Sequence, residues 1–546
     1  MSLVRLYNVS KRYDENLVLR DVFFHLDEGD RVGLIGKNGV GKTTVLKLIL
    51  GQEEPAAGTV EVQEGVNVET FSQFSELEGN GMGSAASILD VLEELFADIR
   101  AIEEELLAIQ VALERPSPED ELYRLLNRQA ALLEEMERRD GWTYQNRIDT
   151  VLTKLGFSDA HRQRPIDQLS GGWRNRAALA RILLSCGRRG GPDVLLMDEP
   201  TNYLDIEGLL WLEGWLLGEL RGALIVVSHD RHFLDQVVNR IVEIENHHFQ
   251  EYQGNFAEYV RQKPMRIKTL ERQFQHEEEL LALEAEAIAD RREAARDPSK
   301  ALRRRLADVK KRVAPRPVDR IVTGIYEGLY VSSNLCRVER IAKAYDEQVL
   351  FQALSFEIQR GDRIAVVGPN GCGKTTLLKV LTGLEVPDAG RVLWVSGIEY
   401  AYYNQVFEEL DWNDTVTHAI NVVGIAYAAP RKKVNRFLSL LQFSELDLQQ
   451  RIGTLSGGQR SRVALAQCLL SGAAVLFLDE PTNHLDLAST QVMERALVHF
   501  PGAVVAVSHD RFFIDKVATR LLIFGGAGHV REVAGNWTIW QASGGA

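Results

Sequence analysis

An α/β fold in which one domain occurs twice, with helical segments added in two places, is predicted from three features of the sequence. A glycine-rich loop lies between an apolar strand and a helix at residues 36–44, and the same arrangement returns at 368–376. An Asp-Glu pair follows a second apolar strand at 198–199 and again at 479–480. Strands that alternate with helices in this order form a mainly parallel sheet, and the repeated order of the motifs indicates a duplication.

Matched residues show where the two copies differ. Three pairs are 332 positions apart: Tyr13 with Tyr345, Lys42 with Lys374, and Gln73 with Gln405. At Ser170 and Ser456 the separation has fallen to 286, so the first copy carries a net 46 extra residues between Gln73 and Ser170. We therefore expect a first domain at 1–260, with an insertion at about 84–140, and a second domain at 329–546.

The insertion is predicted to be an antiparallel helical hairpin, or arm. Apolar residues from Ile88 to Leu113 alternate at spacings of four and three, which is typical of the seam of one long helix. A second helical pattern from Glu121 to Arg139 places Leu122, Leu126, Leu133 and Met136 on one face. An extra pair of core helices is the alternative, but the second copy lacks the segment, so the shared core does not require it.

The segment between the two domains, 261–328, is predicted to be another helical hairpin. Phe274, Leu281 and Ile288 recur every seven residues. Asp297-Pro298 suits the start of the second helix, because Asp caps a helix and Pro is tolerated in its first turn. From Arg291 to Arg316 there are eleven basic and three acidic residues, although the whole chain has a net charge of −14.

A basic cluster of this kind is typical of a surface that contacts the phosphate backbone of RNA, although a solvated charged helix is the ordinary alternative. The candidate RNA-binding residues are Arg291, Arg292, Arg296, Lys300, Arg303, Arg304 and Arg305.

The composition of the 546-residue chain excludes several classes of protein. It is 45% hydrophobic and 26% charged, as expected of folded domains rather than disorder. It contains no uninterrupted apolar stretch of the roughly 18 residues that a membrane helix needs. The N-terminus shows no signal-peptide pattern, and the four cysteines are scattered, so we expect a cytoplasmic protein without a disulfide framework or structural zinc site.

The two glycine-rich loops predict phosphate-binding sites. Glycines let backbone N–H groups turn towards a phosphate, which also meets the positive end of the following helix. In such P-loops the lysine contacts the β- and γ-phosphates, and the next threonine binds Mg²⁺. The loop residues are Gly36, Asn38, Gly39, Gly41, Lys42, Thr43 and Thr44 in the first copy, and Gly368, Asn370, Gly371, Gly373, Lys374, Thr375 and Thr376 in the second.

The repeated Asp-Glu pairs supply the carboxylates that phosphoryl chemistry needs. The first of each pair, Asp198 or Asp479, suits the Mg²⁺ shell. The second, Glu199 or Glu480, suits a general base that polarises the attacking water. An isolated Asp-Glu pair is uninformative, but a P-loop at the right distance upstream makes it specific.

Leu-Ser-Gly-Gly segments at 169–172 and 455–458 complete the pattern, and together these motifs resemble those of ATP-binding cassette proteins. The resemblance implies hydrolysis of ATP to ADP and phosphate between two cassettes packed head to tail, so that a monomer suffices. One ATP site would combine Lys42 and Glu199 with Ser456, Gly457 and Gly458; the other would combine Lys374 and Glu480 with Ser170, Gly171 and Gly172. It also implies Mg²⁺ sensing by Gln73 and Gln405, contact with the γ-phosphate by His229 and His509, and stacking on adenine by Tyr13 and Tyr345.

Both cassettes in one chain, an arm in only the first, a charged helical linker and Trp173 after the first signature resemble the ABC-F family. The resemblance implies a ribosomal partner, with the linker hairpin entering the tRNA exit site towards the P-site tRNA and contacting rRNA. It leaves open whether the protein acts as a general translation factor or protects the ribosome from antibiotics. The ATPase component of a membrane transporter and a DNA-maintenance ATPase are the alternative functions.

Overall fold

The computed structural model describes residues 2–14, 16–71, 86–114, 119–186, 192–202, 204–269, 272, 333–345, 348–404, 410–426, 431–441, 443–483, 485–525 and 528–543. Most of the predicted linker hairpin, with all the candidate RNA-binding residues, lies outside these residues, as do Gln73 and Gln405. No helix in the described part of the chain is long and apolar enough to cross a bilayer.

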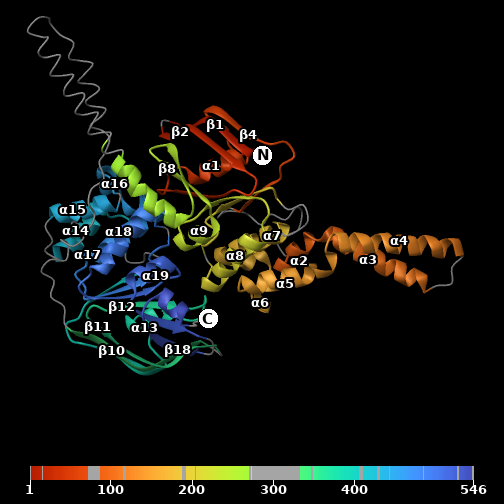
Figure 1. Cartoon of the computed structure of the whole chain (residues 1–546). Coiled ribbons are helices and arrows are strands. Elements are labelled where there is room, and N and C mark those ends of the chain that lie inside the picture. Colours follow the sequence, from red (N-terminus) through yellow and green to blue (C-terminus); the bar gives the residue numbers. More distant parts are fainter. Residues whose placement is uncertain are drawn as a thin grey trace, which may run out of the picture.

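Two sheets form the first copy of the repeated domain (Figure 1). An antiparallel sheet has the order β2-β1-β4, and a larger sheet has the order β5-β6-β7-β3-β8-β9. The larger sheet is parallel except for β9, which pairs antiparallel with β8. The strands are β1 (Ser2–Tyr13), β2 (Asn16–Asp27), β3 (Arg31–Gly36), β4 (Ala57–Val62), β5 (Val68–Phe71), β6 (Val194–Asp198), β7 (Ala223–Val227), β8 (Arg240–Glu245) and β9 (His248–Gln253).

Helices cover the larger sheet, and two of its central strands, β6 and β7, are buried at every position. Complete burial explains why these strands are continuous apolar runs rather than alternating patterns. The helices are α1 (Lys42–Ile49), α2 (Ile88–Glu94), α3 (Ala97–Leu113), α4 (Glu119–Arg138), α5 (Tyr144–Lys154), α6 (Asp159–Arg162), α7 (Gly171–Cys186), α8 (Ile206–Gly218) and α9 (Arg231–Val237).

The second copy repeats the same strand order, β11-β10-β13 and β14-β15-β16-β12-β17-β18, which confirms the duplicated α/β fold. Its strands are β10 (Asn334–Tyr345), β11 (Gln348–Gln359), β12 (Arg363–Val367), β13 (Ala389–Trp394), β14 (Tyr400–Tyr403), β15 (Val475–Asp479), β16 (Ala503–Val507), β17 (Arg520–Phe524) and β18 (Val530–Ala534). Its helices are α13 (Lys374–Leu381), α14 (Val416–Ala426), α15 (Arg431–Leu440), α16 (Glu445–Gln449), α17 (Gly457–Leu470), α18 (Leu487–Val498), α19 (Arg511–Val517) and α20 (Trp537–Ala542).

The predicted helical arm is present in the first copy. Helices α3 and α4 lie side by side and extend away from the sheets (Figure 1). Two arginines bridge the pair: Arg128 of α4 donates to Glu105 at 2.7 Å, and Arg139, just after α4, donates to Asp98 at 2.6 Å. Ile99, Ile102 and Ile109 of α3 are buried against α4.

Two details of the predicted arm are wrong. The chain from Ile88 to Leu113 is not one helix, because it turns at Leu95 and Phe96 between α2 and α3. Isolated bridges join Ser87 to Pro165 and Thr415 to Arg451, so α2 occupies the place of α14 and belongs to the shared core. The heptad spacing continued through the turn because both helices bury the same side of the chain.

The second error concerns the buried face of α4. Leu132 and Met136 are buried and Leu125 packs against them, whereas Leu122, Leu126 and Leu133 are each about 40% exposed or more. The helix carries leucines on two faces, and only contact with α3 decides which face is buried.

A helix at residues 256–269 runs across the predicted end of the first domain at 260. Two of its cations anchor it to the last strands of the sheet. Lys263 bonds to Glu243 of β8, and Arg266 Nη1 donates to the hydroxyl of Tyr252 in β9 at 2.7 Å. The start of the linker is thus part of the first cassette's packing.

The base of the arm should respond strongly to loss of packing. Phe96 is 1% exposed and its ring lies 5.2 Å from that of Tyr144, so Phe96→Ala should lower the free energy of unfolding of the first cassette by about 3–5 kcal/mol. Tyr123→Ala, on the exposed face of α4, should change it by no more than about 0.5 kcal/mol. Urea denaturation measures both; equal effects would contradict the packing described here.

Candidate functional site

The two glycine-rich loops have the same geometry, between β3 and α1 and between β12 and α13. Gly41 has φ 109° and Gly373 has φ 103°, and each immediately precedes its helix. A Cβ on Gly41 would lie 2.3 Å from Val18 Cγ1, so both the backbone angle and the space require glycine. The loop can therefore present backbone N–H groups at the N-terminus of the helix, where an anion binds.

The loop lysines are held over their own loops. Lys42 Nζ donates to the carbonyl oxygen of Gly36 at 2.9 Å, and Lys374 Nζ donates to that of Gly368 at 2.8 Å. Burial lowers the pKa of Lys42, although the carboxylates of Glu199, Asp486 and Asp198 act in the opposite direction. Both ammonium groups are therefore positioned where a phosphate bound in the loop would meet them.

The Asp-Glu pairs stand at the carboxyl ends of β6 and β15. Thr43 Oγ1 donates to Asp198 Oδ2 at 2.7 Å, and Thr375 hydrogen-bonds to Asp479 in the same way. Burial raises the pKa of both aspartates. A hydroxyl and a carboxylate in contact are hard oxygen ligands, which together with phosphate oxygens of a nucleotide fit the preference of Mg²⁺.

Each glutamate of these pairs has a strained backbone that directs its side chain. Glu199 has φ 52° and Glu480 has φ 47°, left-handed values that are uncommon and strained for a residue other than glycine. Each accepts a hydrogen bond at 3.3 Å from a backbone N–H, that of His229 or of His509. The imidazole Nε2 of each histidine lies 3.3 Å from the other oxygen of its glutamate.

Burial sets the protonation of these groups. It raises the pKa of Glu199 to about 8 and that of Glu480 to about 7. Burial, together with the charge of Lys374, lowers the pKa of His509 to about 3. The two glutamates therefore exchange protons near neutral pH, the range in which a general base is effective.

One cavity of about 2370 Å³ joins the two cassettes. Its wall includes the loop of each cassette and the Ser-Gly-Gly segment of the other, with Ser170 and Gly172 from the first and Ser456 and Gly458 from the second. The side chain of Ser456 caps α17, and α7 begins at Gly171. The structure thus brings together the two halves of each predicted site.

Two aspartates that the sequence analysis did not single out connect the cassettes at the glycine-rich loops. Asp205 Oδ2 accepts from the backbone N–H of Asn370 at 3.2 Å, and Asp486 Oδ2 faces that of Asn38 at 3.5 Å. Each also caps a helix of its own cassette, α8 or α18. Both follow the Asp-Glu pairs by a few residues, and their repetition is the signal that could have identified them.

The two Ser-Gly-Gly segments are supported differently. In the second cassette Gln459 donates to Asp447 at 3.1 Å. At the matching positions of the first cassette, Trp173 stacks on His161, with ring centroids 4.1 Å apart. His161 and Trp173 line the cavity, so the wall opposite Lys374 is aromatic.

The two tyrosines expected at the adenine occupy the ends of β1 and β10. Tyr345 lines the cavity, whereas Tyr13 is not among its lining residues. They are 43% and 47% exposed, and their hydroxyls bond to Glu53 and Glu385 respectively. Each ring therefore has an exposed face beside its loop.

This fold and site define a tandem ATP-binding cassette ATPase. A family model described as ABC transporter matches residues 19–202 and 351–483, and another with the same description matches 242–320. The chain belongs to the ABC-F family. It is 33% identical to the energy-dependent translational throttle protein EttA of Mycobacterium tuberculosis, covering 95% of this chain and 90% of that protein.

Other similarities agree. ABC transporter F family member 5 of Arabidopsis thaliana is 32% identical over 95% of this chain and 74% of its own length. Among solved structures, the complex of the archaeal ribosomal stalk protein aP1 with the ribosome recycling factor aABCE1 matches with a TM-score of 0.64, at 22% identity, covering 98% of this chain and 92% of that one. The structural match supports the fold.

The raised pKa of Glu480 makes a prediction about stability and pH. Its ordinary value is 4.5 and its folded value about 7, so the unfolded chain releases this proton first and the free energy of unfolding falls as pH rises towards 7. Glu480→Gln removes this penalty. The stability gained by the variant should grow from pH 6 to pH 7 by about 1 kcal/mol and level off above pH 7. Urea denaturation at pH 6, 7 and 8 without nucleotide measures it, and a gain independent of pH would contradict the raised pKa.

Proposed function

We propose that this ATPase binds the ribosome in an ATP-bound form with its cassettes closed, and leaves after hydrolysis. The observation that carries the proposal is the shared cavity, in which each P-loop faces the Ser-Gly-Gly segment of the other cassette. ATP in either site would contact both cassettes and stabilise their closed arrangement. A ligand that binds one arrangement better than another shifts the population towards it, so ATP would control ribosome occupancy.

Within each site, the residues take distinct roles in the proposal. Lys42 and Lys374 hold the β- and γ-phosphates, and Tyr13 and Tyr345 stack on adenine. Thr43 with Asp198, and Thr375 with Asp479, hold Mg²⁺, which neutralises charge on the phosphate oxygens when bound. Gln73 and Gln405 complete the metal shell.

Glu199 and Glu480 orient the attacking water and accept its proton. Oxygen Oε1 of each is buried, accepts no hydrogen bond from the described residues and has the histidine Nε2 3.3 Å away, so the proposal assigns the water to this oxygen. His229 and His509 lie beside these oxygens and hold the glutamates through their backbone N–H groups. Ser170 to Gly172 and Ser456 to Gly458 close each site on the γ-phosphate.

The ribosomal partner is supported by the relatives, one of which is named as a translational throttle protein. The proposal places the linker hairpin at the tRNA exit site, with its basic residues on rRNA and its tip towards the P-site tRNA. The effect on translation would be either modulation of elongation or protection of the ribosome from antibiotics. The arm supplies a second projection from the first cassette, with Leu107, Val111 and Tyr123 exposed.

Trapping ATP should trap the ribosome complex. The Glu199→Gln/Glu480→Gln double variant binds ATP without hydrolysing it, so it should co-sediment with ribosomes at least about tenfold more than wild type when ATP is present. Adding Lys42→Ala and Lys374→Ala to the same variant is the control, and it should abolish the enrichment. Sedimentation equal to that of the wild type would reject the proposed function.

Neutralising the basic linker should weaken ribosome binding and not free ATPase turnover. Arg303→Gln/Arg304→Gln/Arg305→Gln should lower affinity and reduce the slope of log affinity on log salt by up to about 3, because each lost phosphate contact removes about one unit. The matched control replaces three exposed arginines of the antiparallel sheets by Gln: Arg20, Arg337 and Arg391. If log affinity depends on log salt with the same slope in both triple variants, the linker arginines do not contact the RNA backbone.

A further inference from the structure

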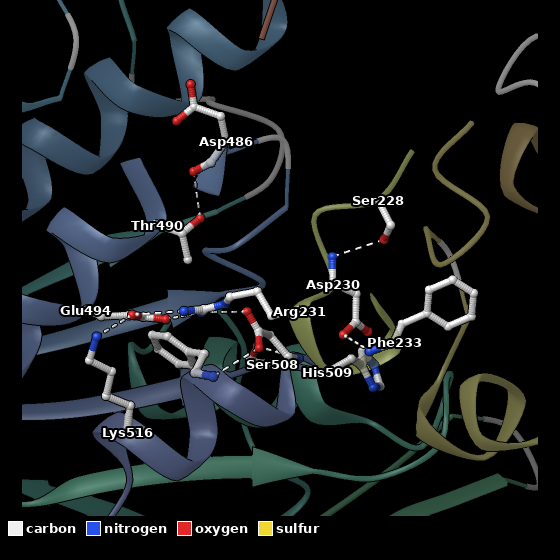
Figure 2. A network of polar contacts seen from close by, with 12 residues as sticks. Ser228, Asp230, Arg231, Phe233, Asp486, Thr490, Glu494, Ser508, His509 and Lys516 are labelled. Atoms are coloured by element: carbon white, nitrogen blue, oxygen red, sulfur yellow. Dashed lines mark hydrogen bonds and ion pairs between the residues drawn. The ribbon is translucent and has the colours of Figure 1, made fainter. Parts of the chain in front are cut away.

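Two buried arginines cross between the cassettes. Figure 2 shows the first of them, Arg231, with Glu494 and Lys516 beside it. Arg231 follows His229-Asp230 in the first cassette, and its Nη1 donates to Glu494 Oε2 of α18 at 3.2 Å, with a second bond to Oε1. Arg511 follows His509-Asp510 in the second cassette and forms the corresponding pair of bonds with Glu213 of α8. All four residues are 5% exposed or less. These two arginine–glutamate pairs occupy matching positions of the two cassettes.

The repetition ends at a third contact. Arg231 Nη2 also lies 3.3 Å from Asp510 Oδ2, across the interface. The matching pair, Arg511 and Asp230, forms no hydrogen bond or ion pair within the described residues. Each aspartate caps its own helix: Asp230 accepts from the backbone N–H of Phe233 in α9, and Asp510 from that of Phe513 in α19, both at 3.0 Å. The difference therefore lies in the contact with the arginine. Burial and the nearby charge of Asp510 raise the pKa of Asp230 to about 6, although the charge of Arg511 acts in the opposite direction from beyond contact distance.

The neighbours of the two glutamates reinforce this asymmetry. Glu494 receives a second cation, because Lys516 Nζ donates to its Oε2 at 2.9 Å. The residue of the first cassette that matches Lys516 is Gln236. Glu213 instead lies 3.5 Å from His232 Nδ1. Arg231 is thus fixed by two carboxylates of the second cassette, one of them held by a further lysine.

The contact between Arg231 and Asp510 is one residue away from the histidine that holds Glu480. Asp510 is the residue after His509, whose backbone N–H donates to Glu480 and whose ring lies 3.3 Å from it. At its other end, Arg231 is two residues after His229, which holds Glu199 in the same way. One guanidinium group therefore connects the segment behind Glu199 to the segment behind Glu480.

We propose that Arg231 is a positioning residue that couples the two ATP sites in one direction, by setting the place of the His509-Asp510 segment and so the turnover of the Glu480 site. Arg511, in contrast, holds the interface without positioning the His229-Asp230 segment. The proposal rests on the roles given above to Glu480 and His509. It predicts that the two sites are unequal although their catalytic residues are the same.

The test uses matched substitutions in two backgrounds. Glu199→Gln leaves turnover to the Glu480 site, and Glu480→Gln leaves it to the Glu199 site. In the first background Arg231→Lys should lower kcat about tenfold, equivalent to about 1.4 kcal/mol of transition-state stabilisation, and change KM less than about twofold. In the second background Arg511→Lys should lower kcat less than about threefold. Lysine retains the charge, and a thermal midpoint close to that of the parent shows that the variant is folded.

Asp510→Asn provides the second measurement, because asparagine still caps α19 but removes the carboxylate that Arg231 meets. In the Glu199→Gln background it should lower kcat about as much as Arg231→Lys does. Combining Arg231→Lys with Asp510→Asn should lower kcat no further than either substitution alone. Asp230→Asn, the matched control, should have a smaller effect on the Glu199 site.

The proposal is overturned if kcat falls equally for Arg231→Lys and Arg511→Lys, and equally for Asp510→Asn and Asp230→Asn. It is also overturned if the losses of kcat add in the Arg231→Lys/Asp510→Asn double variant, because Arg231 would then only hold the interface together. The proposed role of Glu480 fails separately, if Glu480→Gln and Glu199→Gln together leave ATP turnover unchanged.

Discussion

Charge buried between the two cassettes is the constraint on which the rest of the structure depends. The loop lysines and the Asp-Glu pairs of both ATP sites line one cavity where the cassettes meet. An ionised group taken from water without a partner costs several kcal/mol. The structure meets this cost by reciprocal pairing: Asp205 and Asp486 face loop N–H groups of the opposite cassette, and Glu213 and Glu494 receive its arginines.

This pairing requires the two cassettes to lie face to face. The carboxylates that complete each loop come from the other copy, so neither cassette alone satisfies its own charges. The duplicated fold gives an interface that is approximately symmetric, and differences between matching residues break the symmetry at particular points. Trp173 and His161 stand where the second copy has Gln459 and Asp447, and Lys516 stands where the first copy has Gln236. The first difference lies at the wall of the shared cavity, and the second lies beside Glu494 at the interface between the cassettes.

The sequence predicted those parts of the structure that depend on local patterns. The glycine loops, the apolar strands and the Asp-Glu pairs are each contained in a few consecutive residues, and their repetition made the duplicated α/β fold specific. The turn at Phe96 was missed because α2 and α3 bury the same side of the chain and keep one heptad spacing. The buried face of α4 was missed because its leucines occupy two faces, and contact with α3 selects Leu132 and Met136. The bond from Arg231 to Glu494 joins residues 263 positions apart, and no local pattern can indicate such a partner.

The same interface also supports the beginning of the linker. The ring of Phe512, in α19 of the second cassette, lies 6.3 Å from that of Phe256, where the helix at 256–269 begins in the first cassette. The guanidinium group of Arg231 lies over the Phe512 ring at 5.5 Å. A cation in contact with two carboxylates and an aromatic face has little freedom to shift alone. Because the helix that leads into the linker begins at Phe256, a change in the separation of the cassettes has to be accommodated at Arg231, Phe512 and Phe256 together. The helix that leads into the linker, and the segments behind Glu199 and Glu480, therefore meet around one buried cation.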